Sequence, residues 1–274
     1  MLGHVIFLYL KKLKKFKIYS TSKKYSLNKN TSLIDVRDIK KVEKFLYEIN
    51  PDIVINCTGL LISESEKKIE DSIQINSLLP NILSRLGDTL DFKLIQISTD
   101  CVFSGKKGNY IEEDYTDGDS VYARTKILGE ISQKNHLTIR TSIIGPELKI
   151  EGSGLLNWFL SQKGSIYGYR KVKWTGLTTL ELAICIEKLI DKDIFGLIHI
   201  IPNEKISKYE LLCLFKKIWN KNNINIIPKD TPTSDKSLSS HRKNFRYKFR
   251  NYEDMLIELK FWMIKNKKIY KHYF

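Results

Sequence analysis

The stretch that decides the fold is Lys93–Glu130, which reads KLIQISTDCVFSGKKGNYIEEDYTDGDSVYARTKILGE. It begins with an apolar run, Leu94–Ser98, which predicts a buried strand that ends in hydroxyl residues. A polar loop containing glycines follows, and Tyr122 and Lys126 then lie on a predicted helix. Residues at positions i and i+4 share one face of a helix. The stretch therefore places a phenol and an ammonium side by side, shortly after the end of a strand.

A phenol next to an ammonium is a proton donor with an adjusted pKa. Tyr ordinarily has a pKa near ~10, and a neighbouring cation lowers this value because it favours the phenolate. We therefore expect Lys126 to lower the pKa of Tyr122, so that Tyr122 exchanges a proton near neutral pH. Thr99, at the strand end, is expected to hydrogen-bond the carbonyl oxygen to which Tyr122 would give its proton. Tyr-x-x-x-Lys alone is weak evidence, because a solvated surface helix in this Lys-rich chain would also show it.

A longer pattern surrounds this pair: S-T-D-x-V-F-x-G, then acidic residues, then Y-x-x-x-K-x-x-G-E. The string resembles the reductase branch of the extended short-chain dehydrogenase/reductases, and most of all the dTDP-4-dehydrorhamnose reductases. Cys101 stands where these reductases usually have a Tyr, a departure that affects the substrate pocket and not the proton relay. The residues that carry the resemblance are Ser98, Thr99, Asp100, Val102, Phe103, Gly105, Tyr122, Lys126, Gly129 and Glu130.

The resemblance implies an α/β fold with a Rossmann-like, doubly wound parallel sheet. Residues 1–145 would bind NAD(P), and residues 146–274 would form a smaller, mixed α/β substrate-binding region that packs partly on the first domain. The alternation of expected strands and helices up to residue 145 also predicts right-handed crossovers and a parallel sheet. Ligands of such sheets bind at the carboxyl ends of the strands. Candidate residues at such ends are Gly3, Ser20, Asp35, Asn56, Thr99 and Ser142.

The beginning of the chain departs from the family pattern. A Rossmann unit opens with a strand and a Gly-rich turn before its first helix. Here a helix-like run, Val5–Leu13, comes first, and a short strand is expected at Phe16–Tyr19. Gly3 resembles the last glycine of G-x-x-G-x-x-G. We therefore expect the sequence to begin inside the motif, with roughly ten residues, a strand and a turn, missing before it.

The cofactor preference is predicted from the end of the second strand of the motif. An NAD site usually has an Asp or Glu ~20 residues beyond the glycines, bonded to the ribose 2′-hydroxyl. Ser20–Lys24 contains hydroxyls and lysines and no acid, which suits a 2′-phosphate and favours NADPH, with NADH as the alternative. The same lysines would also fit a solvated loop. The expected cofactor contacts are Gly3, Ser20, Thr21, Lys23, Asp35, Val36, Asn56, Cys57, Thr58, Gly59, Asn76, Ser98, Tyr122, Lys126 and Ser142.

The resemblance also implies a reaction. NADPH would deliver a hydride to the C4 carbonyl of a nucleotide-activated 4-keto-6-deoxy sugar, and the product would serve a surface polysaccharide. Tyr122 would donate the proton, Lys126 would also hold the nicotinamide ribose, and Thr99 would bind the carbonyl oxygen. A Mg²⁺ ion and a homodimer follow by family analogy alone, and no metal ligand is predicted. The expected substrate contacts are Thr99, Cys101, Val102, Phe103, Tyr122, Ser142, Trp174 and Arg242.

Two alternatives stay open. Nucleotide-sugar epimerases and 4,6-dehydratases share the Tyr and Lys, but dehydratases usually carry Asp-Glu where this chain has Asp100-Cys101. The string S-T-D-x-V-F disfavours epimerases without excluding them. The second alternative is a non-catalytic partner protein, since the regulatory subunit of methionine adenosyltransferase resembles the same reductases. A chain without the phosphate loop would bind a pyrophosphate poorly, whereas intact Thr99, Tyr122 and Lys126 favour an enzyme.

Composition limits the remaining classes. The chain has 274 residues, of which 42% are hydrophobic, enough for a substantial core in one large domain or two joined ones. No apolar run reaches the ~20 residues of a membrane span, and apolar residues precede the first lysines, unlike a signal peptide. A cytoplasmic protein is therefore expected. The four cysteines are scattered and predict reduced thiols, not disulfides or a metal site.

The net charge of +15 raises the question of a nucleic-acid partner. The lysines are dispersed along the chain, however, and no nucleic-acid-binding motif is present. A basic surface would also suit a nucleotide-sugar, whose diphosphate is anionic. We therefore expect a nucleotide-sugar as the partner, with no nucleic acid and no membrane.

Overall fold

Helices and parallel strands alternate through the first half of the computed structural model, which describes residues 1–133 and 135–274. The predicted helix near the beginning of the chain is present, and Asp38 begins a second helix by accepting the Lys41 N–H. The elements of this half are α1 (Leu2–Leu13), β1 (Ser20–Ser22), β2 (Thr31–Leu33), α2 (Ile39–Ile49), β3 (Ile53–Asn56), α3 (Ile62–Lys67), α4 (Ile69–Ser72), the π-helical η1 (Ile73–Leu78), α5 (Leu79–Leu90), β4 (Lys93–Ile97), η2 (Asp100–Val102), α6 (Val121–Leu128) and β5 (Leu137–Arg140).

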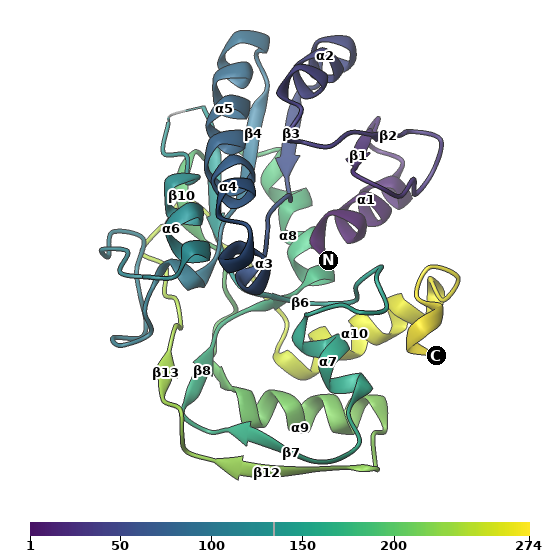
Figure 1. Cartoon of the computed structure of the whole chain (residues 1–274), viewed down its shortest axis with the longest axis vertical. Coiled ribbons are helices and arrows are strands. Elements are labelled where there is room, and N and C mark those ends of the chain that lie inside the picture. Colours follow the sequence, from purple (N-terminus) through teal and green to yellow (C-terminus); the bar gives the residue numbers. More distant parts are fainter. Residues whose placement is uncertain (134) are drawn as a thin grey trace.

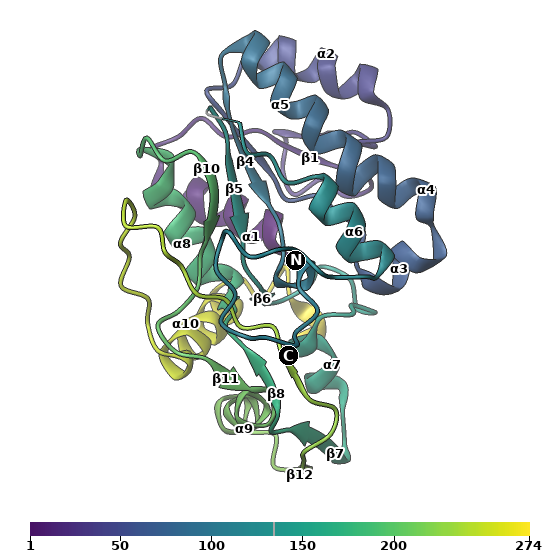
Figure 2. The same ribbon diagram turned by 90° about the vertical axis from the view of Figure 1, so that its left-hand side faces the viewer.

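The main sheet has four parallel strands in the order β10-β5-β4-β3, and β1 and β2 form a separate parallel pair. Successive residues of a strand point to opposite faces. In β4, Leu94 packs with α2 and α5, whereas Ile95 packs with α1 and α8 (Thr179–Ile190). Helices therefore cover both faces of the sheet (Figure 2), which is the doubly wound arrangement that the sequence predicts.

The second half of the chain forms short sheets and helices around α9, below the main sheet in Figure 1. β7 pairs with β12, β8 lies between β11 and β13, and β6 pairs with β9. Ser207 begins α9 with a capping box in which Ser207 and Glu210 bond each other's backbone N–H groups. The elements are β6 (Ile143–Ile144), α7 (Leu155–Ser161), β7 (Gly164–Tyr169), β8 (Val172–Trp174), β9 (Leu177–Thr178), α8, β10 (Gly196–His199), β11 (Ile206–Ser207), α9 (Lys208–Trp219), β12 (Ile224–Lys229), β13 (Ser234–Asp235), α10 (Tyr252–Lys265) and η3 (Lys271–Tyr273).

Segments from the second half complete the first. β10 extends the main sheet beside β5, and α8 lies against α1 in one hydrophobic core that also includes α9 and α10. The boundary at residues 145 and 146 stays a prediction. Among the described residues, no helix is both long and apolar enough to cross a membrane.

One local prediction is wrong in position. The strand expected at Phe16–Tyr19 lies instead at Ser20–Ser22. Phe16 and Ile18 pack against the core from an irregular segment, so their apolar character reflects packing and not strand pairing. The strand begins where Ser20 N–H can donate to the carbonyl of Asn30, in the turn before β2.

The segments at residues 167–170 and 173–176, which are rich in aromatic and basic residues, lie largely in β7 and β8. β7 pairs along its length with β12, which lies far along the chain. Such a partner leaves no local signal in the sequence, because strand pairing depends on distant backbone groups.

Candidate active site

The three predicted catalytic residues meet where β4 ends and α6 begins. Thr99 follows β4, and its Oγ1 accepts a hydrogen bond from Cys101 N at 3.1 Å and lies 3.2 Å from Asp100 Oδ1. Tyr122 and Lys126 come from α6, which Ser120 caps by accepting the Ala123 N–H at 3.1 Å. The cap sets the first turn of α6, so it also sets the position of Tyr122.

Lys126 is a buried cation that ties α6 to the end of β4. Its Nζ donates to the carbonyl of Ile97 at 2.7 Å. Burial lowers the pKa of Lys126 to about 8, and the charge of Glu130 raises it. An ammonium has three donors, and among residues 1–133 and 135–274 this single carbonyl is its one hydrogen-bond acceptor. Lys126 therefore retains donors for ligand hydroxyls.

Tyr122 behaves differently from the prediction. Burial raises its pKa above the ordinary value, Cys101 and Asp100 raise it further, and the Thr99 hydroxyl, which contacts the phenol, lowers it. Lys126 does not contribute, so the prediction that Lys126 lowers this pKa is wrong for this structure. The reason is desolvation of the phenolate, together with the bonding of the ammonium to Ile97. Tyr122 keeps its proton throughout the neutral range.

α6 is held in place by the π-helical segment η1. Asn76 accepts the Leu60 N–H at 2.9 Å and donates to Thr125 Oγ1 on α6 at 3.2 Å. At Gly129, a Cβ would lie 1.9 Å from the carbonyl oxygen of Asn76, so only glycine permits this contact. π-helical segments are frequent at functional sites. Asn76 is 1% exposed and bonded to the protein, so it positions α6.

One of the expected cofactor residues after β3, Cys57, lies near Gly3 in the first turn of α1. Asn56 donates to Gln96 Oε1 at 2.7 Å and accepts the Thr58 N–H at 3.1 Å, which shapes the turn after the strand. A Cβ on Gly3 would lie 3.3 Å from Cys57 Cβ. A Cβ on Gly59 would lie 3.3 Å from Asn76 Oδ1. Cofactor contacts at these positions stay predictions.

Ser98 and Ser142 both have protein partners. The Ser98 hydroxyl donates to Glu130 Oε1 at 2.7 Å, and Glu130 also accepts from Arg140. Ser142 Oγ accepts from Trp174 Nε1 at 2.7 Å, so these two predicted substrate residues lie together. Cys101 is partly buried, and burial raises the pKa of its thiol to about 12. The Cys101 thiol is therefore protonated at neutral pH.

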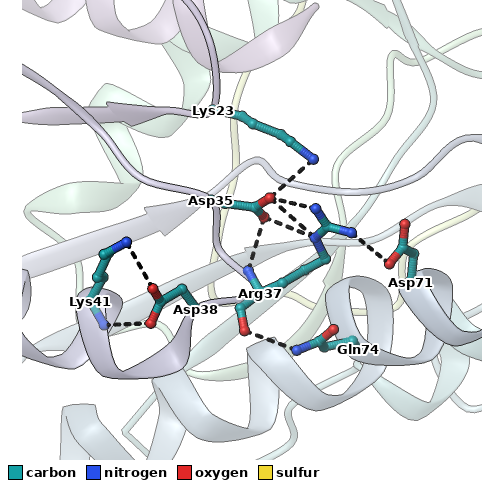
Figure 3. A network of polar contacts seen from close by, with 7 residues as sticks. All are labelled: Lys23, Asp35, Arg37, Asp38, Lys41, Asp71 and Gln74. Atoms are coloured by element: carbon teal, nitrogen blue, oxygen red, sulfur yellow. Dashed lines mark hydrogen bonds and ion pairs between the residues drawn. The ribbon is translucent and has the colours of Figure 1, made fainter.

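The ends of β1 and β2 carry an ion-pair network (Figure 3). Asp35 accepts from Arg37 Nη2 at 2.6 Å and lies 3.0 Å from Lys23 Nζ. Arg37 Nη1 donates to Asp71 at 2.9 Å. The Arg37 guanidinium, above all, holds the pKa of Asp35 well below its usual range. Lys23 is exposed, and Arg37 is a cation that the sequence analysis did not identify.

The remaining predicted residues near this network differ in exposure. Ser20 Oγ and Thr31 Oγ1 are 2.9 Å apart, so the Ser20 hydroxyl already has a partner. Thr21 is exposed. Val36 packs at the edge of the core formed by α2, α5 and β4. Their contacts with a cofactor stay predictions.

Burial contradicts the predicted substrate contacts of Val102 and Phe103. Both side chains are 0% exposed. Phe103 stacks on Tyr110 with ring centroids 4.1 Å apart, and the Arg140 guanidinium lies over its ring. The V-F of the motif therefore forms a small core beneath the site. The sequence could not distinguish this core from a pocket wall because both are apolar.

The predicted substrate contact of Arg242 is also contradicted. Its guanidinium donates to the carbonyls of Leu197 at 2.9 Å and Phe195 at 3.0 Å. It lines a cavity of about 840 Å³ whose lining includes none of Thr99, Tyr122 and Lys126. Arg242 therefore holds the segment after β13 against β10, away from the candidate site.

Lys208, the first residue of α9, is a second cation that the sequence analysis missed. Its Nζ lies 4.7 Å from the ring centroid of Trp174. Burial lowers the pKa of Lys208 to about 8, and the charge of Asp100 raises it. Lys208 is thus near the loop after β4, although more than a hundred positions separate them in the sequence. The local signal was limited to Ser207, the cap of α9.

The described residues contain no group of three or more His, Cys, Asp or Glu side chains that could hold a metal ion. The four cysteines are free thiols. Together, the site offers a proton donor, a hydroxyl and a retained ammonium at the carboxyl end of a parallel strand. These groups suit the reduction of a carbonyl.

Two curated relatives match different lengths of the chain. Methionine adenosyltransferase 2 subunit beta from Bos taurus is 23% identical over 201 residues, covering 68% of this chain and 60% of that protein. The dTDP-4-dehydrorhamnose reductase from Mycolicibacterium smegmatis is 33% identical over 103 residues, covering 36% of this chain and 31% of that protein. The chain therefore spans about three fifths, or less, of the length of these relatives.

A solved structure is similar over a greater length. The dTDP-4-dehydrorhamnose reductase from Bacillus anthracis, in complex with NADP, superimposes with a TM-score of 0.81. The superposition covers 95% of each chain at 22% sequence identity, so the similarity shows that the two chains share a fold. The model of one family, described as the RmlD substrate binding domain, matches residues 11–244. Because this match runs through most of the chain, the protein belongs to the RmlD substrate-binding domain family.

Proposed function

We propose that the chain is an NADPH-dependent reductase of the C4 keto group of a nucleotide-activated 4-keto-6-deoxy sugar. The observation that carries the proposal is the meeting of Thr99, Tyr122 and Lys126 at the carboxyl end of β4. Family membership and the NADP named with the Bacillus anthracis reductase support it. The role in making a deoxysugar for a surface polysaccharide is part of the same proposal.

The residues divide the chemistry among them. When bound, a reduced nicotinamide supplies the hydride. Tyr122, which keeps its proton at neutral pH, donates that proton to the carbonyl oxygen as the oxygen gains charge. The Thr99 hydroxyl hydrogen-bonds the same oxygen. Lys126, charged below its pKa of about 8, uses its remaining donors to hold the ribose hydroxyls.

The preference for NADPH over NADH rests on two cations at the ends of β1 and β2. Lys23 and Arg37 both pair with the Asp35 carboxylate, and Asp71 pairs with the other side of Arg37, so two cations and two acids balance in this network. A bound phosphate would therefore compete with Asp35 and Asp71 for the two cations. A 2′-phosphate suits such cations, because planar Arg and flexible Lys are the side chains that bind phosphates.

A second candidate function is that of a non-catalytic partner subunit. The observation that favours it is the match to methionine adenosyltransferase 2 subunit beta, which extends over 201 residues. The dTDP-4-dehydrorhamnose reductase from Mycolicibacterium smegmatis matches over 103 residues. The proton donor, Thr99 and the retained ammonium count against this candidate, because a binding partner has no use for them.

Two measurements test the proposal. NADPH is titrated into the protein and nicotinamide fluorescence is followed, and NADPH oxidation is then measured with a panel of 4-keto-6-deoxy nucleotide-sugars. Tyr122→Phe should bind NADPH as the wild type does and lower turnover by a factor on the order of 10²–10⁴, since it removes one proton donor. Unchanged turnover in Tyr122→Phe would exclude this mechanism. A wild type that binds no NADPH would favour the partner-subunit candidate.

A further inference from the structure

Lys208 occupies a position that does not favour a lysine. It is the first residue of α9, where the helix dipole is positive and a cation is disfavoured. The side chain is partly buried, and its Nζ lies over the ring of Trp174, which is 3% exposed. Among residues 1–133 and 135–274, no side chain or backbone group accepts a hydrogen bond from this ammonium. Stability alone does not explain such a residue.

A second lysine faces the same place. Lys236, which follows β13, is partly buried, and its Cγ would lie 2.9 Å from a Cβ built on Gly105. The charges of both Lys208 and Lys236 act on Asp100, which is 6% exposed. Within the described part of the chain, Lys236 also has no hydrogen-bond or ion-pair partner. Two ammonium groups thus face one carboxyl group, which leaves a net positive charge.

This excess charge lies next to the predicted reaction centre. Asp100 contacts the Thr99 hydroxyl, and Asp100 and Cys101 are both close enough to Tyr122 to affect its ionisation. Lys208 comes from α9, in the second half of the chain, and lies close enough to Asp100 for its charge to act on that carboxyl group. A ligand whose reacting carbonyl lies at Thr99 and Tyr122 would extend toward Lys208.

We propose that Lys208, with Lys236 beside it, binds the diphosphate group of the nucleotide-sugar, and that Trp174 holds the lysine side chain in place. This inference rests on the proposed function. The ammonium groups would form charge-assisted hydrogen bonds with phosphate oxygens, which are stronger than neutral ones. Asp100 remains paired with one of the two positive charges. The cation over the indole keeps its hydrogen-bond donors free, because a cation–π contact uses none of them.

Calorimetric titration tests this subsite without requiring turnover. Thymidine diphosphate, uridine diphosphate and thymidine are each titrated into the wild type and into Lys208→Met, which keeps the length of the side chain and removes the charge. The variant should bind both diphosphates roughly 10- to 100-fold more weakly, the loss expected for hydrogen bonds to a charged group. Thymidine affinity should not change, because the nucleoside has no phosphate.

NADPH titration of the same variant identifies which diphosphate is bound. The cofactor also has a pyrophosphate, but the proposal assigns Lys208 to the sugar nucleotide, so NADPH affinity should equal that of the wild type. Lys205→Met is the matched control, since Lys205 lies on the same segment, and its charge is paired with Asp235 at 3.0 Å. This control should bind both diphosphates normally. Lys236→Met should show a smaller loss than Lys208→Met.

Several outcomes would contradict the proposal that Lys208 binds the diphosphate. Equal diphosphate affinity in the wild type and Lys208→Met would do so, as would an equal loss for thymidine or for NADPH. A lower melting temperature of Lys208→Met would indicate a structural role, whereas the subsite predicts an equal or higher one, because a partly buried ammonium without a hydrogen-bond acceptor is removed and Lys236 still faces Asp100. A wild type that binds NADPH but no diphosphate refutes the subsite alone. A wild type that shows Lys208-dependent diphosphate binding but no NADPH binding refutes the reductase and supports the subsite.

Discussion

The two ends of the candidate cofactor site handle charge in opposite ways. At the end of β4, Lys126 is buried, bonded to one backbone carbonyl, and has its pKa lowered by burial. At the ends of β1 and β2 the charged groups lie nearer to solvent, and two cations, Lys23 and Arg37, are balanced by two acids, Asp35 and Asp71 (Figure 3). Desolvated groups interact strongly, whereas exposed ion pairs contribute little because water screens them. We therefore expect changes at the first end to have large effects and changes at the second to tune selectivity.

The end of the site at β4, which contains the buried Lys126, depends most on the contact between α6 and η1. In Gly129→Ala the new Cβ would lie 1.9 Å from the Asn76 carbonyl oxygen and 3.2 Å from Pro80 Cγ. The backbone oxygen cannot yield without moving η1, so α6 must shift. The free energy of unfolding should fall by about 1–3 kcal/mol, as for other overpacked sites, and turnover should fall with it. Urea unfolding measures the first effect.

Leu128→Ala is the control for this substitution. Leu128 is the neighbouring residue and is 65% exposed, so its truncation should leave the free energy of unfolding within about 0.5 kcal/mol of the wild-type value. If Gly129→Ala were as stable as Leu128→Ala, close packing would not explain the glycine. The end of the site at β4 would then be less closely packed than we infer from its burial.

The pH dependence of NADPH binding should reveal Lys126. Its pKa is lowered to about 8 by burial, so the ammonium is present below this value and is lost as the pH rises above it. NADPH affinity should therefore be constant between pH 6.5 and 7.5 and decline above about 8. Cys57, which faces Lys126, does not titrate in this range because burial raises the pKa of its thiol to about 12.

Lys126→Arg tests whether the decline in NADPH affinity comes from Lys126 or from another group. A guanidinium stays charged throughout the range, so the decline should move to higher pH in the variant even if the affinity at neutral pH is lower. A decline at the same pH in both proteins would assign it to another group. A wild-type affinity that is constant to pH 10 would show that the ammonium is not needed to hold the cofactor.

Local patterns predicted the parts of the molecule that depend on nearby residues. The strand before Ser98 and the spacing of Tyr122 and Lys126 on one helix follow from a few consecutive residues. Their agreement with the structure has a physical reason, since strand and helix periodicity are short-range effects.

Properties that depend on packing could not be predicted in the same way. The pKa of Tyr122 depends on burial by distant segments, and Phe103 is covered by Tyr110 and Arg140. Lys208 comes near Asp100 only because the second half of the chain folds against the first. Long-range contacts of this kind leave no pattern in neighbouring residues, so the walls of the site were predicted less well than its centre.

The exposed network at β1 and β2 gives the smallest expected effect and the clearest test of selectivity. Arg37→Gln and Lys23→Gln each remove one cation that would face a 2′-phosphate, so each should weaken NADPH binding, on the order of tenfold or less, and leave NADH binding unchanged. Lys41→Gln is the matched control, because Lys41 pairs with Asp38 on the adjacent helix turn and not with Asp35. An equal loss for NADPH and NADH would mean that these cations only hold the β2 loop in shape.

Raising the salt concentration should reduce the difference in affinity between NADPH and NADH, since exposed charges are screened. A difference that persists in high salt would mean that this end of the site is as desolvated as the other, and the contrast between the two ends would fail.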